Sequence, residues 1–134
     1  MSVKAILIED SAEIRQAITP ALSELADVHV AAFAEEAGEA VQLLIRQPCE
    51  LVILDLFLRK GSGLDVLAHM RADGYRTPVV VLTNYATEDT RERCLTAGAE
   101  AVFDKSTELD AFFEYCLEFS DQKYVRDSTL QAPF

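Results

Sequence analysis

Acidic, hydroxyl and amino side chains follow four of the five short apolar runs in this sequence. Glu9 and Asp10 follow the first run, and Asp55 follows the third. Thr83 follows the fourth run, and Lys105 comes shortly after the fifth. Carboxylates gathered at one place oppose each other's ionisation unless a cation compensates them. Mg²⁺ suits such a group, because it prefers oxygen ligands and is commonly held by one or two carboxylates with a phosphate oxygen. The lysine and the threonine could then hydrogen-bond the remaining phosphate oxygens.

These residues can meet only if the apolar runs are neighbouring strands of one sheet. Most of the runs are nearly uninterrupted in Val, Ile, Leu and Ala, as strands that are covered on both faces require. Stretches with helical spacing of apolar residues alternate with them, which predicts a parallel α/β sheet. In such sheets the loops at the carboxyl ends of the strands carry the site. The five predicted strands are Val3–Ile8, Val28–Phe33, Leu51–Leu54, Val79–Leu82 and Ala101–Phe103.

Helical periodicity predicts one helix after each strand. The first stripe continues in phase past Pro20, so we expect one kinked helix there. Ser62 is the expected N-cap of the third helix, and Gly74 and Gly98 stand where the third and fourth helices should end. The fifth stripe fades after Phe119. We therefore expect one domain over residues 1–120, followed by a short C-terminal tail or linker stub over 121–134.

Composition excludes several classes of function. The chain has 134 residues, 50% of them hydrophobic, and a formal net charge of -11. Such an acidic chain, whose basic residues do not cluster, is repelled by phosphate backbones, which argues against direct nucleic-acid binding. No apolar run approaches the roughly 20 residues of a membrane-spanning helix, so no membrane partner is expected. The three cysteines form no CxxC pair, which predicts buried thiols in the cytoplasm rather than a zinc site or disulfides.

Five segments resemble the response-regulator receiver domain of two-component signalling, in the CheY-like superfamily, and the resemblance covers about residues 3–120. The segments are LIED at 7–10, VILDLFL at 52–58, GSGLDVL at 61–67, VVVLTN at 79–84 and AGAEAVFDKS at 97–106. The resemblance implies a doubly wound, flavodoxin-like (βα)5 fold. Its five parallel strands would lie in the order 2-1-3-4-5, with two helices on one face and three on the other.

The same resemblance implies a role for each site residue. Asp55 would accept a phosphoryl group from a phosphohistidine of a sensor histidine kinase or a histidine phosphotransfer protein. Lys105 would pair with that phosphoryl group. Thr83 would hydrogen-bond it and thereby switch the surface formed by the fourth helix, the fifth strand and the fifth helix, which would meet an unknown downstream protein. The resemblance also makes a homodimer through this surface possible, and nothing in the sequence decides it.

The resemblance also implies a metal cofactor, Mg²⁺ or Mn²⁺. Asp10 and Asp55 would bind the ion directly, Glu9 would bind it through water, and the backbone carbonyl of Phe57 would be a further ligand. Such a protein is not an enzyme in the usual sense, because it catalyses only its own phosphorylation and dephosphorylation.

The sequence departs from the family pattern at four positions. Val102 stands where an aromatic residue commonly switches rotamer, and Ser106 replaces the proline that usually follows the lysine. Asn84 follows Thr83 where a very small residue is usual, and Arg59 replaces a common proline. In addition, the bulky Phe57 and Tyr85 occupy the positions that flank the path of the hydrolytic water in the family. We expect them to shield the acyl phosphate, although they could simply cover the sheet edge.

Two alternative functions remain. A degenerate receiver would keep the fold and act as a phosphate-independent interaction module, but the intact Asp10, Asp55, Thr83 and Lys105 argue against it. A phosphatase of the haloacid-dehalogenase type also uses Asp, Lys, Thr and Mg²⁺ at a sheet edge. That family needs a second acid two residues after its nucleophile, and here Phe57 occupies the position.

Overall fold

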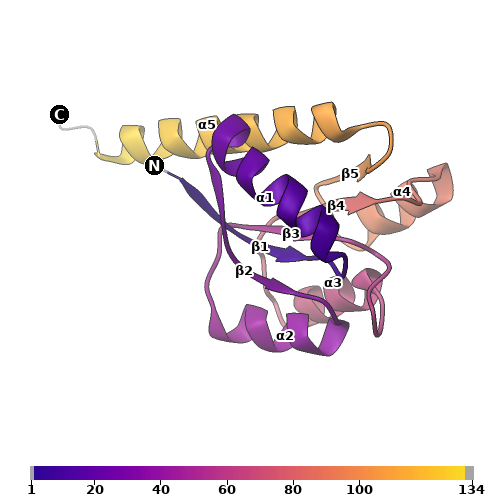
Figure 1. Ribbon diagram of the computed structural model, residues 1–134. Helices are drawn as coiled ribbons and strands as arrows, with labels where there is room; N and C mark the ends of the chain where they lie inside the picture. Colours follow the sequence, from indigo (N-terminus) through magenta and orange to yellow (C-terminus); the bar gives the residue numbers. More distant parts are fainter. Residues whose placement is uncertain (1, 132–134) are drawn as a thin grey trace.

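One parallel sheet forms the centre of the molecule. The computed structural model describes residues 2–131, and the side chains as far as Lys123. The strand order is β2-β1-β3-β4-β5, as expected from the resemblance (Figure 1). Each observed strand agrees with its predicted range to within one residue, since the buried apolar runs mark the strands clearly. The strands are β1 (Val3–Ile8), β2 (Val28–Ala34), β3 (Leu51–Leu54), β4 (Val79–Thr83) and β5 (Ala101–Asp104).

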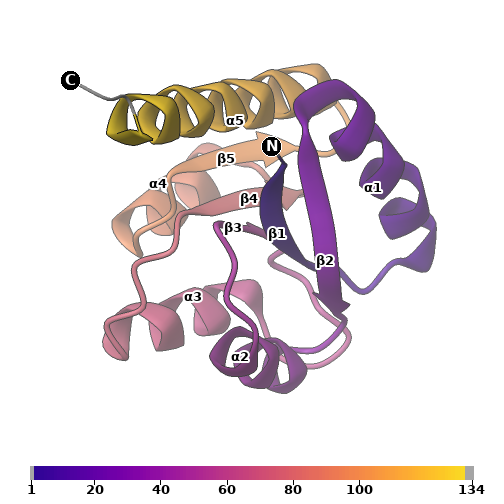
Figure 2. The same ribbon diagram turned by 90° about the vertical axis from the view of Figure 1, so that its left-hand side faces the viewer.

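Five helices cover the two faces of this sheet. They are α1 (Ala12–Ala26), α2 (Ala37–Arg46), α3 (Gly63–Ala72), α4 (Glu88–Thr96) and α5 (Leu109–Gln131). One core includes Leu22 of α1 and Phe112 of α5, and the other joins Leu44, Leu67 and Cys94 of α2, α3 and α4. Figure 2 shows α1 and α5 on one side of the sheet and α2 and α3 on the other. No helix in the described part of the chain is both long and apolar enough to cross a membrane.

Local signals fix the helix ends as the sequence predicts. The Ser62 hydroxyl accepts a hydrogen bond from the backbone N–H of Asp65, which caps α3. Gly74 and Gly98 have positive φ angles of 77° and 109° where α3 and α4 end. α1 contains Pro20 and runs on to Ala26 as one helix.

The fifth helix is longer than its apolar stripe. The segment that the sequence suggests as a tail is helical as far as Gln131, because α5 continues past the point where its apolar stripe fades. The apolar periodicity of the sequence fades in this stretch while the helix itself continues. Lys123, in this continuation, forms an ion pair with Glu50, and Figure 1 shows the helix running past the start of β1.

The three thiols are protected to different degrees. Cys94 and Cys116 are buried, whereas Cys49 is only half-buried, less than predicted. Burial raises the pKa of Cys116 to about 12 and raises the pKa values of Cys49 and Cys94 as well. Because the thiolate is the reactive form, we expect a disulfide-exchange reagent at pH 8 to label at most Cys49 in the folded protein. Titration in denaturant should reveal all three thiols, and rapid native labelling of Cys116 would contradict this prediction.

Candidate functional site

Backbone pairing continues past the ends of the strands and brings the predicted residues together. The N–H of Asp55 donates to the carbonyl of Ile8, at 2.9 Å, so the residue after β3 lies beside the end of β1. In the same way the N–H of Lys105 donates to the carbonyl of Thr83, at 2.9 Å. The loops after β1, β3, β4 and β5 therefore share one edge of the sheet, as the strand order requires.

Three carboxylates form a cluster at this edge. One oxygen from each of Glu9, Asp10 and Asp55 lies within 4.8 Å of the others. Glu9 and Asp55 are buried, whereas Asp10 is half-buried. Oxygen donors so close together match the ligand set of a hard divalent cation. The carboxylates predicted from the sequence as metal ligands thus form a ligand set that suits Mg²⁺.

Lys105 is the cation next to this cluster. Its Nζ lies 2.5 Å from Glu9 Oε1 and 2.8 Å from Asp55 Oδ2, and only 8% of its side chain is exposed. Burial by itself lowers the pKa of Lys105, but hydrogen bonds and charges from Asp55 and Glu9 outweigh it, so the pKa is raised. The ammonium group is therefore charged and bridges the two buried carboxylates.

The pKa of Glu9 is also raised. Burial is the main cause, the hydrogen bond from Lys105 opposes it, and the charge of Asp55 adds to it. The other oxygen of Glu9 accepts a hydrogen bond from the N–H of Ser11, at 3.1 Å. Arg15 fixes the backbone here, since its Nη1 donates to the carbonyl of Glu9 at 2.7 Å.

Asp55 is held from both sides. Its Oδ1 accepts hydrogen bonds from the N–H groups of Leu56 and Phe57, at 2.7 and 3.4 Å. Its Oδ2 is the oxygen that Lys105 contacts. The start of α3 packs directly behind it: the N–H of Gly63 donates to the carbonyl of Leu56 at 2.9 Å, and a Cβ at position 63 would lie 2.2 Å from the carbonyl oxygen of Asp55. Only glycine fits at this contact.

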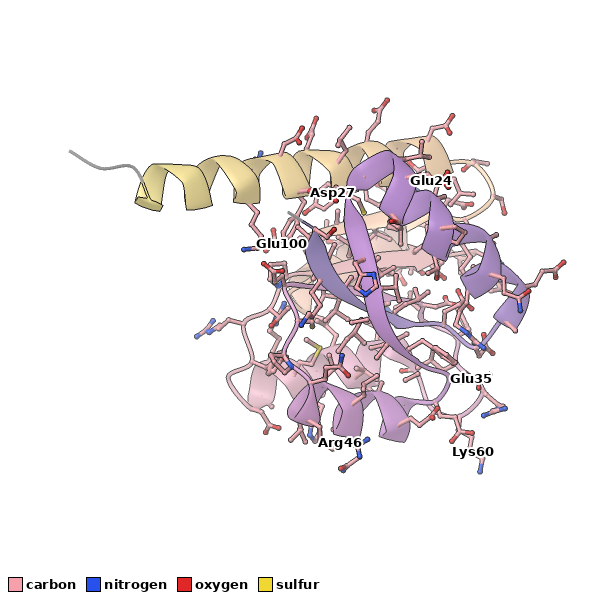
Figure 3. The ribbon with its side chains drawn as sticks, turned by 60° about the vertical axis from the view of Figure 1, so that its left-hand side comes forward. Glu24, Asp27, Glu35, Arg46, Lys60 and Glu100 are labelled. Carbon is pink, nitrogen blue, oxygen red and sulfur yellow. The ribbon has the colours of Figure 1, made fainter. Side chains whose placement is uncertain are left out.

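The loop after Asp55 is tied to the loop after β2. The N–H of Arg59 donates to the carbonyl of Glu35, and the N–H of Ala37 donates to the carbonyl of Lys60. Figure 3 shows Glu35 and Lys60 at one end of the sheet, and Asp27 and Glu100 at the other. The Arg59 side chain adds an ion pair with Glu36, at 3.0 Å. Arg59 therefore restrains this loop by contacts where the family pattern has a proline.

Thr83 and two aromatic rings complete the edge. Thr83 is fully buried, and its Oγ1 accepts a hydrogen bond from the N–H of Tyr85 at 3.3 Å. The rings of Phe57 and Tyr85 lie 4.5 Å apart between centroids, and each residue is 57% exposed. Asn84 and Ser106, two positions at which the sequence departs from the family pattern, contact each other. The Ser106 hydroxyl donates to Asn84 Oδ1 at 3.3 Å.

The position of the usual aromatic switch is filled by an aliphatic side chain. Val102 is 8% exposed and belongs to the core beneath α2, α3 and α4. Phe103 points to the opposite face, as strand geometry predicts, and its ring lies 6.0 Å from that of Phe112. The peptide bond between Lys105 and Ser106 is trans.

The sequence did not point to Arg91, in α4. Its guanidinium bonds the carbonyls of Ala86 and Val102, each at 2.9 Å, and the Glu108 carboxylate at 2.5 Å. An arginine within a helix carries no spacing signal of its own. Only the fold shows that this one faces a loop, a strand and the start of another helix.

The comparisons with known proteins agree with this geometry. The family model for the response regulator receiver domain matches residues 5–116. The chain belongs to this family. The response regulator PilR of Pseudomonas aeruginosa is 34% identical over 107 residues, which are 79% of this chain and 23% of PilR. The probable C4-dicarboxylate response regulator DctR of Priestia megaterium is 25% identical over 95% of this chain and 59% of DctR. The receiver chain thus spans less than two thirds of the length of each of these relatives.

Solved structures share the receiver fold. A Francisella response regulator receiver domain superposes with a TM-score of 0.78 at 19% identity, covering 86% of this chain and 93% of that one. The phosphorylated cyanobacterial phytochrome response regulator RcpA gives a TM-score of 0.74 at 26% identity, covering 89% of this receiver and 91% of RcpA.

Proposed function

We propose that Asp55 of this receiver accepts a phosphoryl group from a phosphohistidine of a sensor histidine kinase or a histidine phosphotransfer protein. The observation that carries the proposal is the contact of Asp55 Oδ2 with Lys105, inside a cluster of three carboxylates. RcpA, at 26% identity, is a phosphorylated response regulator, which supports the same chemistry here. The proposal also implies a partner for the switched surface. This partner is either an unknown downstream protein or a second copy of this chain.

The residues divide the reaction between them. An ionised Asp55 oxygen attacks the phosphorus and the P–N bond breaks. The imidazole ring, protonated on its other nitrogen, leaves as neutral imidazole with the electron pair of that bond. No general base is needed, because the carboxylate is already nucleophilic. Lys105 already contacts Asp55 and neutralises charge on the incoming phosphoryl oxygens. The ligands of Mg²⁺ or Mn²⁺ would be Asp10, Asp55, the Phe57 carbonyl and, through water, Glu9. The ion would supply further positive charge.

Thr83 would respond to the phosphoryl group on Asp55. Its hydroxyl is buried beside the site and bonds only locally, to the N–H of Tyr85. A phosphoryl oxygen on Asp55 is a stronger acceptor than the groups that surround it now. The Thr83 hydroxyl would therefore donate to it and draw the loop between β4 and α4 inward.

Phosphorylation can be tested directly by intact mass. The wild-type protein is incubated with Mg²⁺ and acetyl phosphate, alongside Asp55→Ala and the control Asp110→Ala, which removes an exposed carboxylate from α5. We expect one phosphoryl adduct on the wild type and the control, and none on Asp55→Ala. The absence of any adduct would instead favour a phosphate-independent receiver, and turnover of a phosphate ester would favour a phosphatase. Chelation of Mg²⁺ should suppress the adduct.

The aromatic pair should lengthen the life of the acyl phosphate. Phe57 and Tyr85 contact each other, at the positions that by the family resemblance flank the path of the hydrolytic water to Asp55. We expect the double variant Phe57→Ala, Tyr85→Ala to lose its phosphoryl group about tenfold faster, equivalent to about 1.4 kcal/mol in the barrier. The decay of the adduct mass after removal of the donor measures this. Leu25→Ala, which truncates an equally exposed apolar residue on α1, is the control, and an equal lifetime in the double variant would contradict the shielding role.

A further inference from the structure

One arginine joins three segments on the α4, β5 and α5 side of the molecule. Arg91 Nε donates to the carbonyl of Ala86, in the loop between β4 and α4. Its Nη1 donates to the carbonyl of Val102, in β5, and its Nη2 donates to Glu108, directly before α5. A guanidinium is planar and rigid, so its three partners are held at fixed positions relative to one another.

Glu108 extends this connection to the loop that carries Lys105. The same Oε1 that Arg91 contacts also accepts the backbone N–H of Asp104, at 3.0 Å. The hydrogen bond from Arg91 is the main reason that the pKa of Glu108 lies below its ordinary value, so this carboxylate is ionised. The chain of contacts therefore begins three residues after Thr83 and ends next to Lys105. Both of these residues belong to the site around Asp55.

We propose that Arg91 is a positioning residue that transmits a displacement of the loop after Thr83 to β5 and to the first turn of α5. This inference rests on the proposed phosphorylation of Asp55. If that loop moves inward, the carbonyl of Ala86 moves with it. The Arg91 guanidinium must then either lose this bond or shift together with its bonds to Val102 and Glu108. The side chain of Val102 is aliphatic and packed in the core. Arg91 contacts β5 through the backbone carbonyl of this residue.

Arg93 provides a matched control on the same helix. It forms an ion pair with Asp89 within α4, at 3.0 Å, and its side chain is 69% exposed. Arg93→Ala therefore removes one positive charge and one ion pair from α4, as Arg91→Ala does. It leaves the contacts to β5 and Glu108 in place. Exposed pairs of this kind contribute little to stability.

The test compares hydrogen exchange with and without the phosphoryl group. The wild type, Arg91→Ala, Glu108→Gln and Arg93→Ala are each treated with Mg²⁺ and acetyl phosphate, and intact mass quantifies the adduct in every sample. We expect phosphorylation of the wild type and of Arg93→Ala to change exchange in peptides covering 84–91 and 102–112. In Arg91→Ala the adduct should form and the change at 84–91 should persist, while the change at 102–112 falls about fivefold or more. Glu108→Gln, which keeps an oxygen acceptor without the charge, should give an intermediate loss.

The difference between phosphorylated and unphosphorylated protein separates transmission from a purely structural role. If Arg91→Ala raises exchange at 102–112 equally in both states, the difference survives and the inference is overturned. A phosphorylated wild type without a change at 102–112 also overturns it, while the proposed function stands. A wild type that takes up no phosphoryl group overturns both. If circular dichroism shows that Arg91→Ala does not fold, Arg91→Lys decides, because an ammonium cannot hold three acceptors in that planar arrangement, and an undiminished difference in this variant overturns the inference.

Discussion

Replacement of Lys105 by methionine is expected to lower the free energy of unfolding of the metal-free protein by about 3 kcal/mol at pH 7. Methionine keeps most of the side-chain volume but removes the ammonium group that bridges Glu9 and Asp55. Both carboxylates are almost fully buried, so each would lose its cationic partner in a poorly solvated place. Urea denaturation of the wild type and the variant in the presence of a chelator measures the difference.

Mg²⁺ should reduce this deficit. A divalent ion held by Glu9, Asp10 and Asp55 would replace the missing positive charge, and any ligand that binds only the folded state stabilises it. The difference in unfolding free energy between Lys105→Met and the wild type should therefore shrink as Mg²⁺ is added. Lys60→Met, which removes an exposed lysine from the neighbouring loop, should be close to neutral under both conditions. If this difference in unfolding free energy does not change with Mg²⁺, the unpaired carboxylates are not the cause of the lower stability of the variant.

The pH dependence of the same pair has a defined sign. The pKa of Lys105 is raised in the folded protein, so its stabilising contribution is complete at pH 7 and is lost only when the pH rises through that raised value. The pKa of Glu9 is raised above its ordinary value of 4.5, so the folded state takes up this proton more readily than the unfolded state. Acidification from pH 7 toward 4.5 therefore favours the folded state at Glu9. The hydrogen bond from Lys105 lowers the pKa of Glu9, so Lys105→Met raises that pKa further and gains more stability than the wild type on acidification. The deficit of Lys105→Met should therefore be smaller near pH 5 than at pH 7.

Much of this fold could be predicted because its strands are buried on both faces. A run such as Val79–Leu82 leaves little ambiguity about where β4 lies, and a parallel sheet then decides which loops meet. Asp55 and Lys105 could be selected for the same reason, as polar residues directly after two of these strands. Their assigned chemistry came from the family resemblance, and the phosphoryl and metal roles remain predictions.

The features that could not be predicted depend on contacts rather than on patterns. The length of α5 was missed because its apolar stripe fades before the helix ends. Arg91 was missed because its three partners lie on different segments, at no fixed spacing from it. The bridge from Lys105 to Glu9 was also not foreseen, since the resemblance assigned the lysine to the phosphoryl group alone. In each case the deciding partner is brought close only by the completed fold.

Gly63→Ala is expected to lower the free energy of unfolding by about 2–4 kcal/mol, although it adds a single methyl group. The new Cβ would lie 2.2 Å from the carbonyl oxygen of Asp55 and 2.9 Å from the Cα of Leu56. Both are backbone atoms, which cannot rotate away as the end of a flexible side chain can. The start of α3 and the loop after Asp55 must therefore move apart, at the expense of the bond from the Gly63 N–H to the Leu56 carbonyl.

Gly38→Ala is the matched control, since this glycine also lies near the start of a helix and its Cβ would meet nothing within 4 Å. There the substitution should stabilise the protein by about 0.5–1 kcal/mol, because alanine loses less backbone entropy in a helix. If both variants are folded, only Gly63→Ala should slow the uptake of the phosphoryl group from acetyl phosphate, by about tenfold or more, because a small displacement of a reacting carboxylate is costly. An unchanged rate in a destabilised Gly63→Ala would mean that the packing of α3 stabilises the fold without setting the position of Asp55.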